Sequence, residues 1–233
     1  MTRPESELSD RDLIRVIRTE LTTAADPARA PQMQAYMKST MPYLGVGLPA
    51  TRSIARAAAR QFPPSGVDDL VISAAELWRS ATFREERYAA TELTGLPIAV
   101  GRIEVLPLCR EMIVTGAWWD HVDGVSARIG VLLTSHRSQL DPVIRQWSTD
   151  PDRWLRRSSI ISQLALKDDT DVDLLTDVIV VNLADREFFV RKAIGWALRQ
   201  YARTDPDWVR AFVSAHRDQL SSLSRREAMK HLG

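Results

Sequence analysis

The sequence predicts an all-α fold, an α-solenoid built from stacked pairs of helices, and three observations support this prediction. Apolar residues recur at three- and four-residue spacing in almost every segment, as they do on the buried face of a helix. Prolines separate the segments, and no convincing alternation of apolar and polar residues indicates a strand. The second half of the chain repeats itself after 34 to 35 residues, which is typical of repeat units that contain two helices each.

The apolar spacing predicts thirteen helices, and short breaks at proline separate many of them. The breaks fall at Pro27, Pro31, Pro42, Pro49, Pro63-Pro64, Pro142, Pro151 and Pro206. In chain order, the expected helices cover residues 9–23, 31–40, 50–61, 67–80, 84–94, 103–115, 117–135, 138–148, 152–166, 172–184, 187–203, 206–218 and 222–231.

The composition predicts one globular domain. The chain has 233 residues, of which 45% are hydrophobic, so a single helical-repeat domain over residues 1–233 can bury a substantial core. The N-terminus is polar and acidic, and the longest apolar run, Val178 to Val181, is too short to span a bilayer. The single cysteine, Cys109, excludes an internal disulfide. These features predict a cytoplasmic protein, associated with the nucleoid in a bacterium.

The charges are segregated along the chain, although the net charge is only +1. Residues 27–67, 153–167 and 188–204 contain lysine and arginine without any acid, whereas five aspartates gather between Asp168 and Asp177. The basic stretches are either solvated helix faces or parts of one basic surface. The charge pattern alone leaves both interpretations open.

The repeat in the second half is carried by aromatic and basic residues. Residues 154–157 match residues 189–192 after 35 positions, and the basic pair at 225–226 ends 34 positions after Lys192. A step of 34 residues back from Arg157 reaches Asp123. We therefore expect four residues to occupy equivalent positions on successive repeats and to face the same surface. These are Asp123, Arg157, Lys192 and Arg226.

The stretch AWWDHVDGV, residues 117–125, separates into two faces of a helix. Trp118, Val122, Val125 and Ile129 recur at core spacing. Trp119 and Asp123 are four residues apart on a neighbouring face, which predicts an aromatic side chain presented beside a carboxylate. The alternative for Trp119 is a second core contact at a helix junction.

The expected helix 187–203 presents a basic stripe with an aromatic residue in its middle. The stripe consists of Lys192, Trp196, Arg199 and Arg203, while Val190, Ala193, Ala197 and Tyr201 can face the core. Cations neutralise phosphates and an indole offers flat contact area, so the stripe suits nucleic acid. Gly195 costs about 1 kcal/mol in a helix relative to alanine, and we expect it to permit the close approach of another helix or of the ligand.

Other chemistries lack a sequence basis. The histidines and Cys109 have no metal-ligand spacing, so neither a metal nor a cofactor is expected. The stretch 169–173 begins like a calcium loop but has Leu174 in place of the required glycine, which favours a solvated helix start. Phosphate-binding glycine loops and a serine-hydrolase elbow are also missing from the sequence.

Four ordered motifs resemble those of the AlkD-type DNA alkylation repair glycosylases. They are Ile113-Val-Thr-x-x-Trp118-Trp119-Asp120-x-Val122-Asp123, Trp154-Leu-x-Arg157, Glu187-Phe-Phe-x-x-Lys192-Ala-Ile-Gly-Trp196-x-Leu-Arg199-x-Tyr201-Ala and Ser224-x-Arg226-Glu-Ala-x-Lys230-His231. The similarity extends to Tyr36-Met37-Lys38 and to residues 84–90, so it covers most of the chain.

This resemblance implies a superhelix of HEAT-like repeats with a concave basic cleft. It also implies a monofunctional glycosylase that hydrolyses the N-glycosidic bond of cationic N3- or N7-alkylated purines in duplex DNA, such as 3-methyladenine and 7-methylguanine, and leaves an abasic site. By the same resemblance, Asp123 would be the catalytic carboxylate that stabilises the oxocarbenium-like sugar and positions water. Trp119 and Trp196 would pack against the deoxyribose, and Arg157 would hold the adjoining phosphate.

Further contacts with duplex DNA that contains alkylated bases are expected from residues of the basic stripe, the repeat and the YMK motif. They are Lys192, Arg199, Arg203, Arg226, Lys38 and Tyr36. A solenoid with its own end caps is expected to be a monomer. Two alternatives remain, namely a non-catalytic helical-repeat protein that recognises distorted duplex DNA and a protein-binding scaffold, which the basic stripe disfavours.

Overall fold

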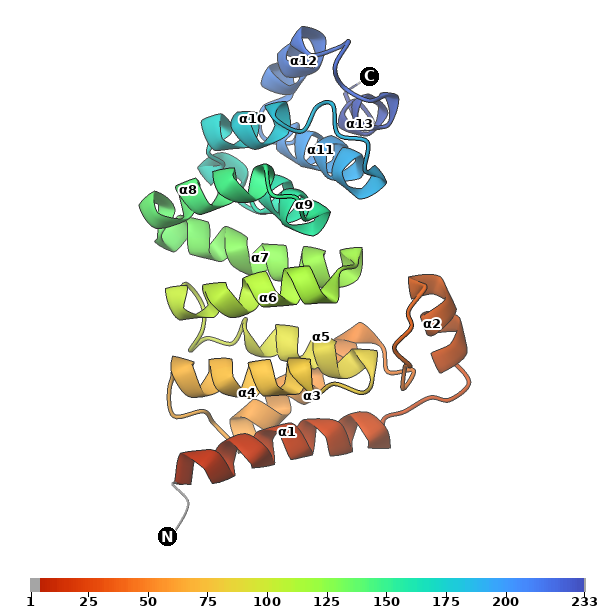
Figure 1. Cartoon of the computed structure of the whole chain (residues 1–233), viewed down its shortest axis with the longest axis vertical. Coiled ribbons are helices and arrows are strands. Elements are labelled where there is room, and N and C mark those ends of the chain that lie inside the picture. The colour runs from red at the N-terminus through yellow and green to blue at the C-terminus, as the bar shows by residue number, and fades with distance from the viewer. Residues whose placement is uncertain (1–4, 233) are drawn as a thin grey trace. The chain divides into compact units, whose positions relative to one another are not determined.

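The computed structural model describes residues 5–232, with side chains from residue 12 onward, and every regular element in this range is a helix. This confirms the predicted all-α fold class, and each of the thirteen expected helices has an α-helix at its position (Figure 1). The elements are α1 (Glu5–Thr23), α2 (Ala30–Met37), α3 (Leu48–Gln61), α4 (Val67–Arg79), α5 (Arg84–Leu93), the 3-10 helix η1 (Ile103–Val105), α6 (Leu106–Gly116), α7 (Trp119–Ser135), α8 (Arg137–Ser148), α9 (Arg153–Ile161), the 3-10 helix η2 (Lys167–Asp169), α10 (Val172–Val180), α11 (Phe188–Tyr201), α12 (Pro206–Ala215) and α13 (Ser222–Ala228).

The helices belong to two compact units that divide between Leu108 and Cys109. The single domain expected over residues 1–233 stays a prediction. In the part of the chain that is described, no helix is both long and apolar enough to cross a membrane.

The first unit is organised around α5, which packs against α1, α3 and α4. Its buried Glu85 carboxylate accepts hydrogen bonds from the backbone N–H groups of Leu44, Gly45 and Val46. Gly45 has a φ of 88°, and a Cβ there would collide with the Asp26 carbonyl group. Only glycine adopts this left-handed conformation without strain, so it lets the loop fold over the carboxylate.

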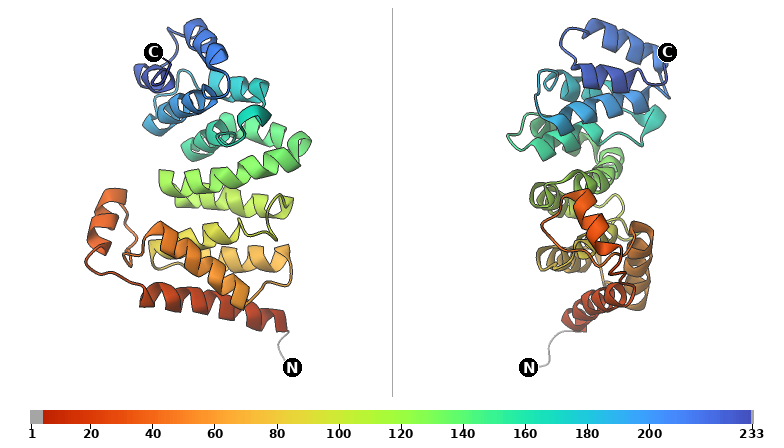
Figure 2. Two further views of the ribbon diagram at one scale, coloured as in Figure 1. Left: turned by 180° about the vertical axis from the view of Figure 1, so that it is seen from behind. Right: turned by 90° about the vertical axis from the view of Figure 1, so that its right-hand side faces the viewer.

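The second unit repeats a helical pair. Figures 1 and 2 show its helices stacked in chain order, and α7, α9, α11 and α13 pack each against the next. Side-chain hydrogen bonds join successive repeats at separations of 32 to 34 residues. Examples are Ser126 to Ser158, Arg157 to Asp123, Arg137 to Asp171, Ser224 to the Arg191 carbonyl and Asn182 to the Ser148 carbonyl. These bonds give the period found in the sequence a direct physical basis.

The core faces of α7 and α11 are those expected from the sequence. Val122, Val125 and Ile129 on α7 are fully buried, as are Val190 and Ala193 on α11. Trp118 differs from the expectation in one respect, because it precedes α7 as the N-cap residue and is only half-buried. Its indole nevertheless packs against other aromatic residues of the unit.

Several expected helices end earlier in the structure, among them 172–184, which ends at Val180, and one expected break lies inside a helix. The helix expected over 152–166 ends at Ile161, and the amide of Gln163 then donates to the Asp171 carbonyl and accepts from the Asp171 N–H, which closes the loop before α10. The helix expected over 187–203 ends at Tyr201, so Arg203 lies in the following turn. Pro142 lies inside α8 rather than at a break.

The calcium-like stretch 169–173 is a helix start, as expected. The Asp171 carboxylate accepts the N–H of Leu174 and so caps α10, and it also forms an ion pair with Arg137. These contacts satisfy the carboxylate within the protein.

Replacing Gly130 with alanine is expected to lower the free energy of unfolding by about 1–3 kcal/mol, because overpacking displaces neighbouring backbone. A Cβ at position 130 would collide with the Ser162 carbonyl oxygen, where the end of α9 approaches α7. Urea unfolding measures the effect. Gly66→Ser is the control, because a Cβ at Gly66 meets nothing within 4 Å. Equal unfolding midpoints for the two variants would contradict the prediction.

Candidate active site

The site is built around an ion pair between two consecutive repeats. Arg157 on α9 donates from Nε to Asp123 Oδ1 at 2.7 Å and from Nη2 to Asp123 Oδ2 at 2.8 Å. Asp123 lies on the second turn of α7, and 34 residues separate the partners. This bidentate geometry fixes the plane of the carboxylate as well as its position. The side chain of Asp123 keeps 19% of its surface exposed, so the carboxylate can still be reached from solvent.

Arg157 is held on all sides within the unit. Its Nη1 donates to the Phe189 carbonyl at 2.7 Å, and its side chain is only 6% exposed. The guanidinium carbon lies 6.0 Å from the ring centroids of both Phe189 and Trp196. The guanidinium is therefore engaged with the carboxylate and the backbone in this structure, and the phosphate contact expected of Arg157 stays a prediction.

The two tryptophans assigned to the site come from different repeats. Trp119 is the first residue of α7, one turn before Asp123, and Trp196 lies in the middle of α11, facing Arg157. Both side chains are partly exposed. The Arg157 guanidinium thus joins Asp123 and Trp196 through its hydrogen bonds and its contact with the indole. Trp119 lies on the same helix as the carboxylate.

A cluster of three aromatic side chains supports the ion pair, and its role was missed in the sequence. Trp118, Trp154 and Phe189 have ring centroids 5.0 to 6.1 Å apart. Phe189 contributes both its ring to the cluster and its carbonyl group to Arg157. The signal that could have found it was present, because Trp154 and Phe189 are aligned by the repeat. Such a cluster makes the surroundings of the ion pair apolar.

Burial raises the pKa of the Asp123 carboxyl above its ordinary value. The hydrogen bonds and the charge of Arg157 act in the opposite direction, and the nearby charge of Asp120 raises the pKa further. A buried carboxylate is costly unless it is paired, so Arg157 is the group that keeps Asp123 ionised.

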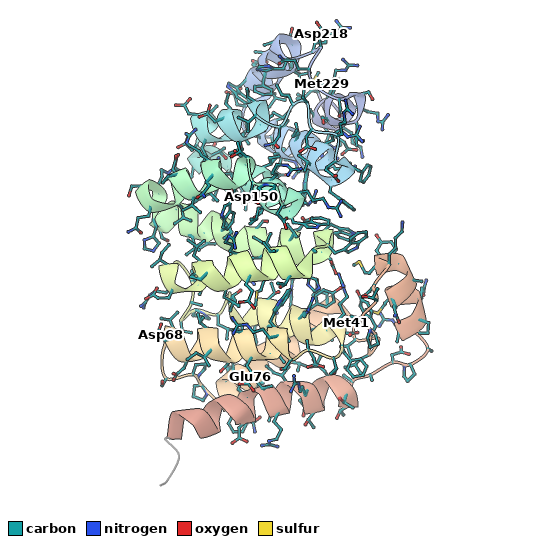
Figure 3. The ribbon with its side chains drawn as sticks, viewed as in Figure 1. Met41, Asp68, Glu76, Asp150, Asp218 and Met229 are labelled. Atoms are coloured by element: carbon teal, nitrogen blue, oxygen red, sulfur yellow. The ribbon has the colours of Figure 1, made fainter. Side chains whose placement is uncertain are left out.

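Two cations of the basic stripe share one carboxylate that was not predicted. Lys192 Nζ lies 3.2 Å from Glu227 Oε1, and Arg199 Nη1 donates to Glu227 Oε2 at 2.7 Å. Glu227 lies on α13, next to Arg226, which is exposed. The sequence signal was an acid 35 residues after Lys192, close to one repeat period. The Met229 label in Figure 3 marks the C-terminal end of α13.

The remaining candidates lie elsewhere. Arg203 lines a cavity of about 350 Å³ at the C-terminal ends of α9 and α11, together with Tyr201 and Lys167. Tyr36, which is 72% exposed, and Lys38 lie at the end of α2 in the other unit. Their contacts with DNA stay predictions. Among the described residues, no group of His, Cys, Asp and Glu side chains could hold a metal ion.

A family model that spans most of the chain identifies its family. Residues 17–232 match the family model described as DNA alkylation repair enzyme. A solved structure from Enterococcus faecalis, described as a predicted DNA alkylation repair enzyme, is 29% identical, with a TM-score of 0.77 over 90% of this chain and 97% of that chain. The crystal structure of AlkD2 from Streptococcus mutans is 16% identical, with a TM-score of 0.64 over 86% of this chain and 98% of that chain, and supports the fold alone. No curated protein matches the chain.

Proposed function

Because the chain belongs to the family of DNA alkylation repair enzymes, we propose that it is a DNA glycosylase. Its substrates are N3- and N7-alkylated purines in duplex DNA, such as 3-methyladenine and 7-methylguanine, and its products are the free base and an abasic site. The observation that carries the proposal is the partly exposed Asp123 carboxylate, which Arg157 fixes in place beside Trp196.

The chemistry of the lesion matches a site with an acceptor and no general acid. An alkylated purine already carries a positive charge, so it leaves as a neutral base and needs no proton from the protein. The sugar develops positive charge at C1′ as the bond lengthens. A carboxylate near C1′ stabilises that charge, and it can also orient and deprotonate the attacking water.

Asp123 can accept further hydrogen bonds while it is paired with Arg157. Each carboxylate oxygen has two acceptor positions, and Arg157 occupies one on each oxygen. The remaining positions are available to water. The fixed orientation of the carboxylate means that little reorganisation is needed when the sugar becomes charged.

Trp119 and Trp196 supply flat faces for the deoxyribose. Their partial exposure suits this role, and each indole adds a cation–π attraction to the charged sugar of about 0.5–2 kcal/mol. Lys192, Arg199 and Arg226 supply positive charge for the adjoining phosphates. The same contacts are independent of the alkyl group, so they fit both small and bulky lesions.

The rate of base release is expected to fall as the pH is lowered. The fall should begin at a higher pH than it would if Asp123 had the pKa of an ordinary aspartate. Only ionised Asp123 acts, so the rate is full above its pKa and is lost as the pH falls through it. Burial raises this pKa, whereas an aspartate ordinarily titrates near ~3.9. Single-turnover rates against pH, corrected for loss of base without enzyme, measure the effect. A rate that stays unchanged down to the ordinary pKa would contradict it.

One assay separates the enzyme from a helical-repeat protein that binds distorted duplex without cutting a bond. The protein is incubated with duplex DNA that contains a single 7-methylguanine, and the DNA is then treated with alkali, which breaks the strand at abasic sites. The proposal predicts a break at the lesion. Binding of the lesion duplex without a break would establish the non-catalytic alternative.

A further inference from the structure

We propose that Glu227 competes with DNA phosphates for Lys192 and Arg199 and thereby restrains phosphate-mediated binding to undamaged duplex. This inference rests on the proposed function, since it requires the basic stripe to meet phosphates. The proposal gives a function to an acidic residue in a surface that is otherwise suited to bind DNA.

The two ion pairs with Glu227 occupy both charged side chains of α11 that flank Trp196. One carboxylate oxygen lies 3.2 Å from Lys192 Nζ and the other 2.7 Å from Arg199 Nη1. The Glu227 side chain is 17% exposed and the Lys192 side chain 38%, so the pairs lie at the border of the surface, where solvent and a phosphate can reach them. A phosphate that binds either cation must share it with Glu227 or displace Glu227.

Gly195 brings Glu227 within reach of both cations. A Cβ at position 195 would lie 2.6 Å from Glu227 Cβ and 2.8 Å from the Ser224 carbonyl oxygen. With any larger residue there, α13 would have to move away from α11. The sequence predicts that Gly195 permits the close approach of a helix or of the ligand, and in the structure α13 makes this approach. It places Glu227 beside the basic stripe.

Glu227 is charged under physiological conditions. Burial acts to raise its pKa, but the hydrogen bond and charge of Lys192, together with the charges of Arg199 and Lys230, outweigh burial and lower the pKa. Three cations and one acid therefore meet at this point. With Glu227 beside it, the basic stripe carries less net positive charge than its lysine and arginines alone would give. The affinity for DNA phosphates depends on that net positive charge.

A reduced net charge weakens binding to lesion and undamaged duplex by the same factor, because both complexes use the same phosphate contacts. Only the lesion complex has further contacts that can hold it after that loss. Contacts with the sugar, from Trp119, Trp196 and Asp123, form only where the damaged nucleotide engages the site. Undamaged duplex depends on phosphates alone. A competing acid thus lowers the affinity for the large excess of undamaged DNA and frees the protein to reach lesions.

The test compares Glu227→Gln with Asp207→Asn, which removes the same charge from an exposed ion pair with Arg210 on α12. Affinity for a short undamaged duplex is measured over a range of salt concentrations. Glu227→Gln is expected to bind about three- to tenfold more tightly at low salt, with a slope of log K against log salt that is steeper by about 0.9 for each further phosphate neutralised. Excess undamaged DNA should also slow its base release more strongly. Asp207→Asn should match the wild type.

Glu227→Asp keeps the charge and is the second variant. A wild-type slope for Glu227→Asp alongside the steeper slope of Glu227→Gln supports the inference. Equal steepening in both variants would assign the effect to altered packing of α13 and overturn it, as would weaker or unchanged binding by Glu227→Gln. Lys192→Ala separates the two proposals. If Lys192→Ala binds DNA as well as the wild type does, the basic stripe does not contact DNA. If Lys192→Ala binds DNA more weakly while Glu227→Gln binds as the wild type does, only the role of Glu227 is overturned.

Discussion

Arg157→Ala is expected to lower the free energy of unfolding by about 3–5 kcal/mol, because the partner charge of a broken buried ion pair is left without compensation. The variant loses both hydrogen bonds to Asp123 and the bond to the Phe189 carbonyl. With the charge and hydrogen bonds of Arg157 gone, the pKa of Asp123 rises further, because both act to lower it. Base release should therefore require a higher pH than in the wild type. Urea unfolding and the rate against pH measure the two effects.

Arg153→Ala is the matched control for this variant. Arg153 lies one turn earlier on α9 and forms an ion pair with Glu187 at 3.1 Å, but both side chains are largely exposed. Exposed ion pairs contribute about 0–1 kcal/mol, so this variant should remain close to the wild type in stability and in base release. If the two arginine variants were equally stable, the buried pair would not be the structural centre of the site.

Asp123→Asn is expected to slow base release by about 10²–10⁴-fold, the range for loss of a positioned proton acceptor. The amide nearly preserves the shape of the carboxylate but removes the charge that we propose stabilises the sugar. Binding of undamaged duplex should remain close to that of the wild type. Single-turnover release of 7-methylguanine, together with a binding curve, measures both quantities.

Asp120→Asn serves as the control for Asp123→Asn. It removes the same charge from the first turn of α7, three residues before Asp123, and should retain base release. Since Asp120 raises the pKa of Asp123, its removal should move the loss of activity in acid to lower pH. Equal losses in the two variants would mean that local charge matters and that the position of Asp123 does not.

Periodicity alone predicted most of the fold, because a helix that buries one face must repeat its apolar residues every three or four positions. Val122, Val125 and Ile129 are fully buried for this reason. One error occurs where a local contact ends a helix. The loop after Ile161 is closed by the hydrogen bonds of Gln163 to the Asp171 backbone, and no apolar spacing encodes such a contact.

The site was predicted as a set of residues, and its internal pairing was not. The repeat placed Asp123 and Arg157 at equivalent positions, but equivalence fixes the backbone and leaves the direction of a side chain undetermined. In the structure the arginine reaches across one repeat to the carboxylate. Opposite charges one period apart are the signal for such pairs, and Lys192 with Glu227 shows it again. The repeat predicts that Arg226 is equivalent to Lys192, but the residue that pairs with Lys192 is the next one, Glu227.

The molecule that leaves the DNA distinguishes cleavage of the N-glycosidic bond from removal of the alkyl group. Duplex DNA with a single isotope-labelled 7-methylguanine is incubated with the protein, and the small molecules and the DNA are analysed separately by mass spectrometry. If the protein cleaves the N-glycosidic bond, intact 7-methylguanine appears in solution together with an equal amount of abasic sites in the DNA. Recovery of unmodified guanine in the strand would show that the alkyl group is removed and the base retained, and it would contradict cleavage of the N-glycosidic bond.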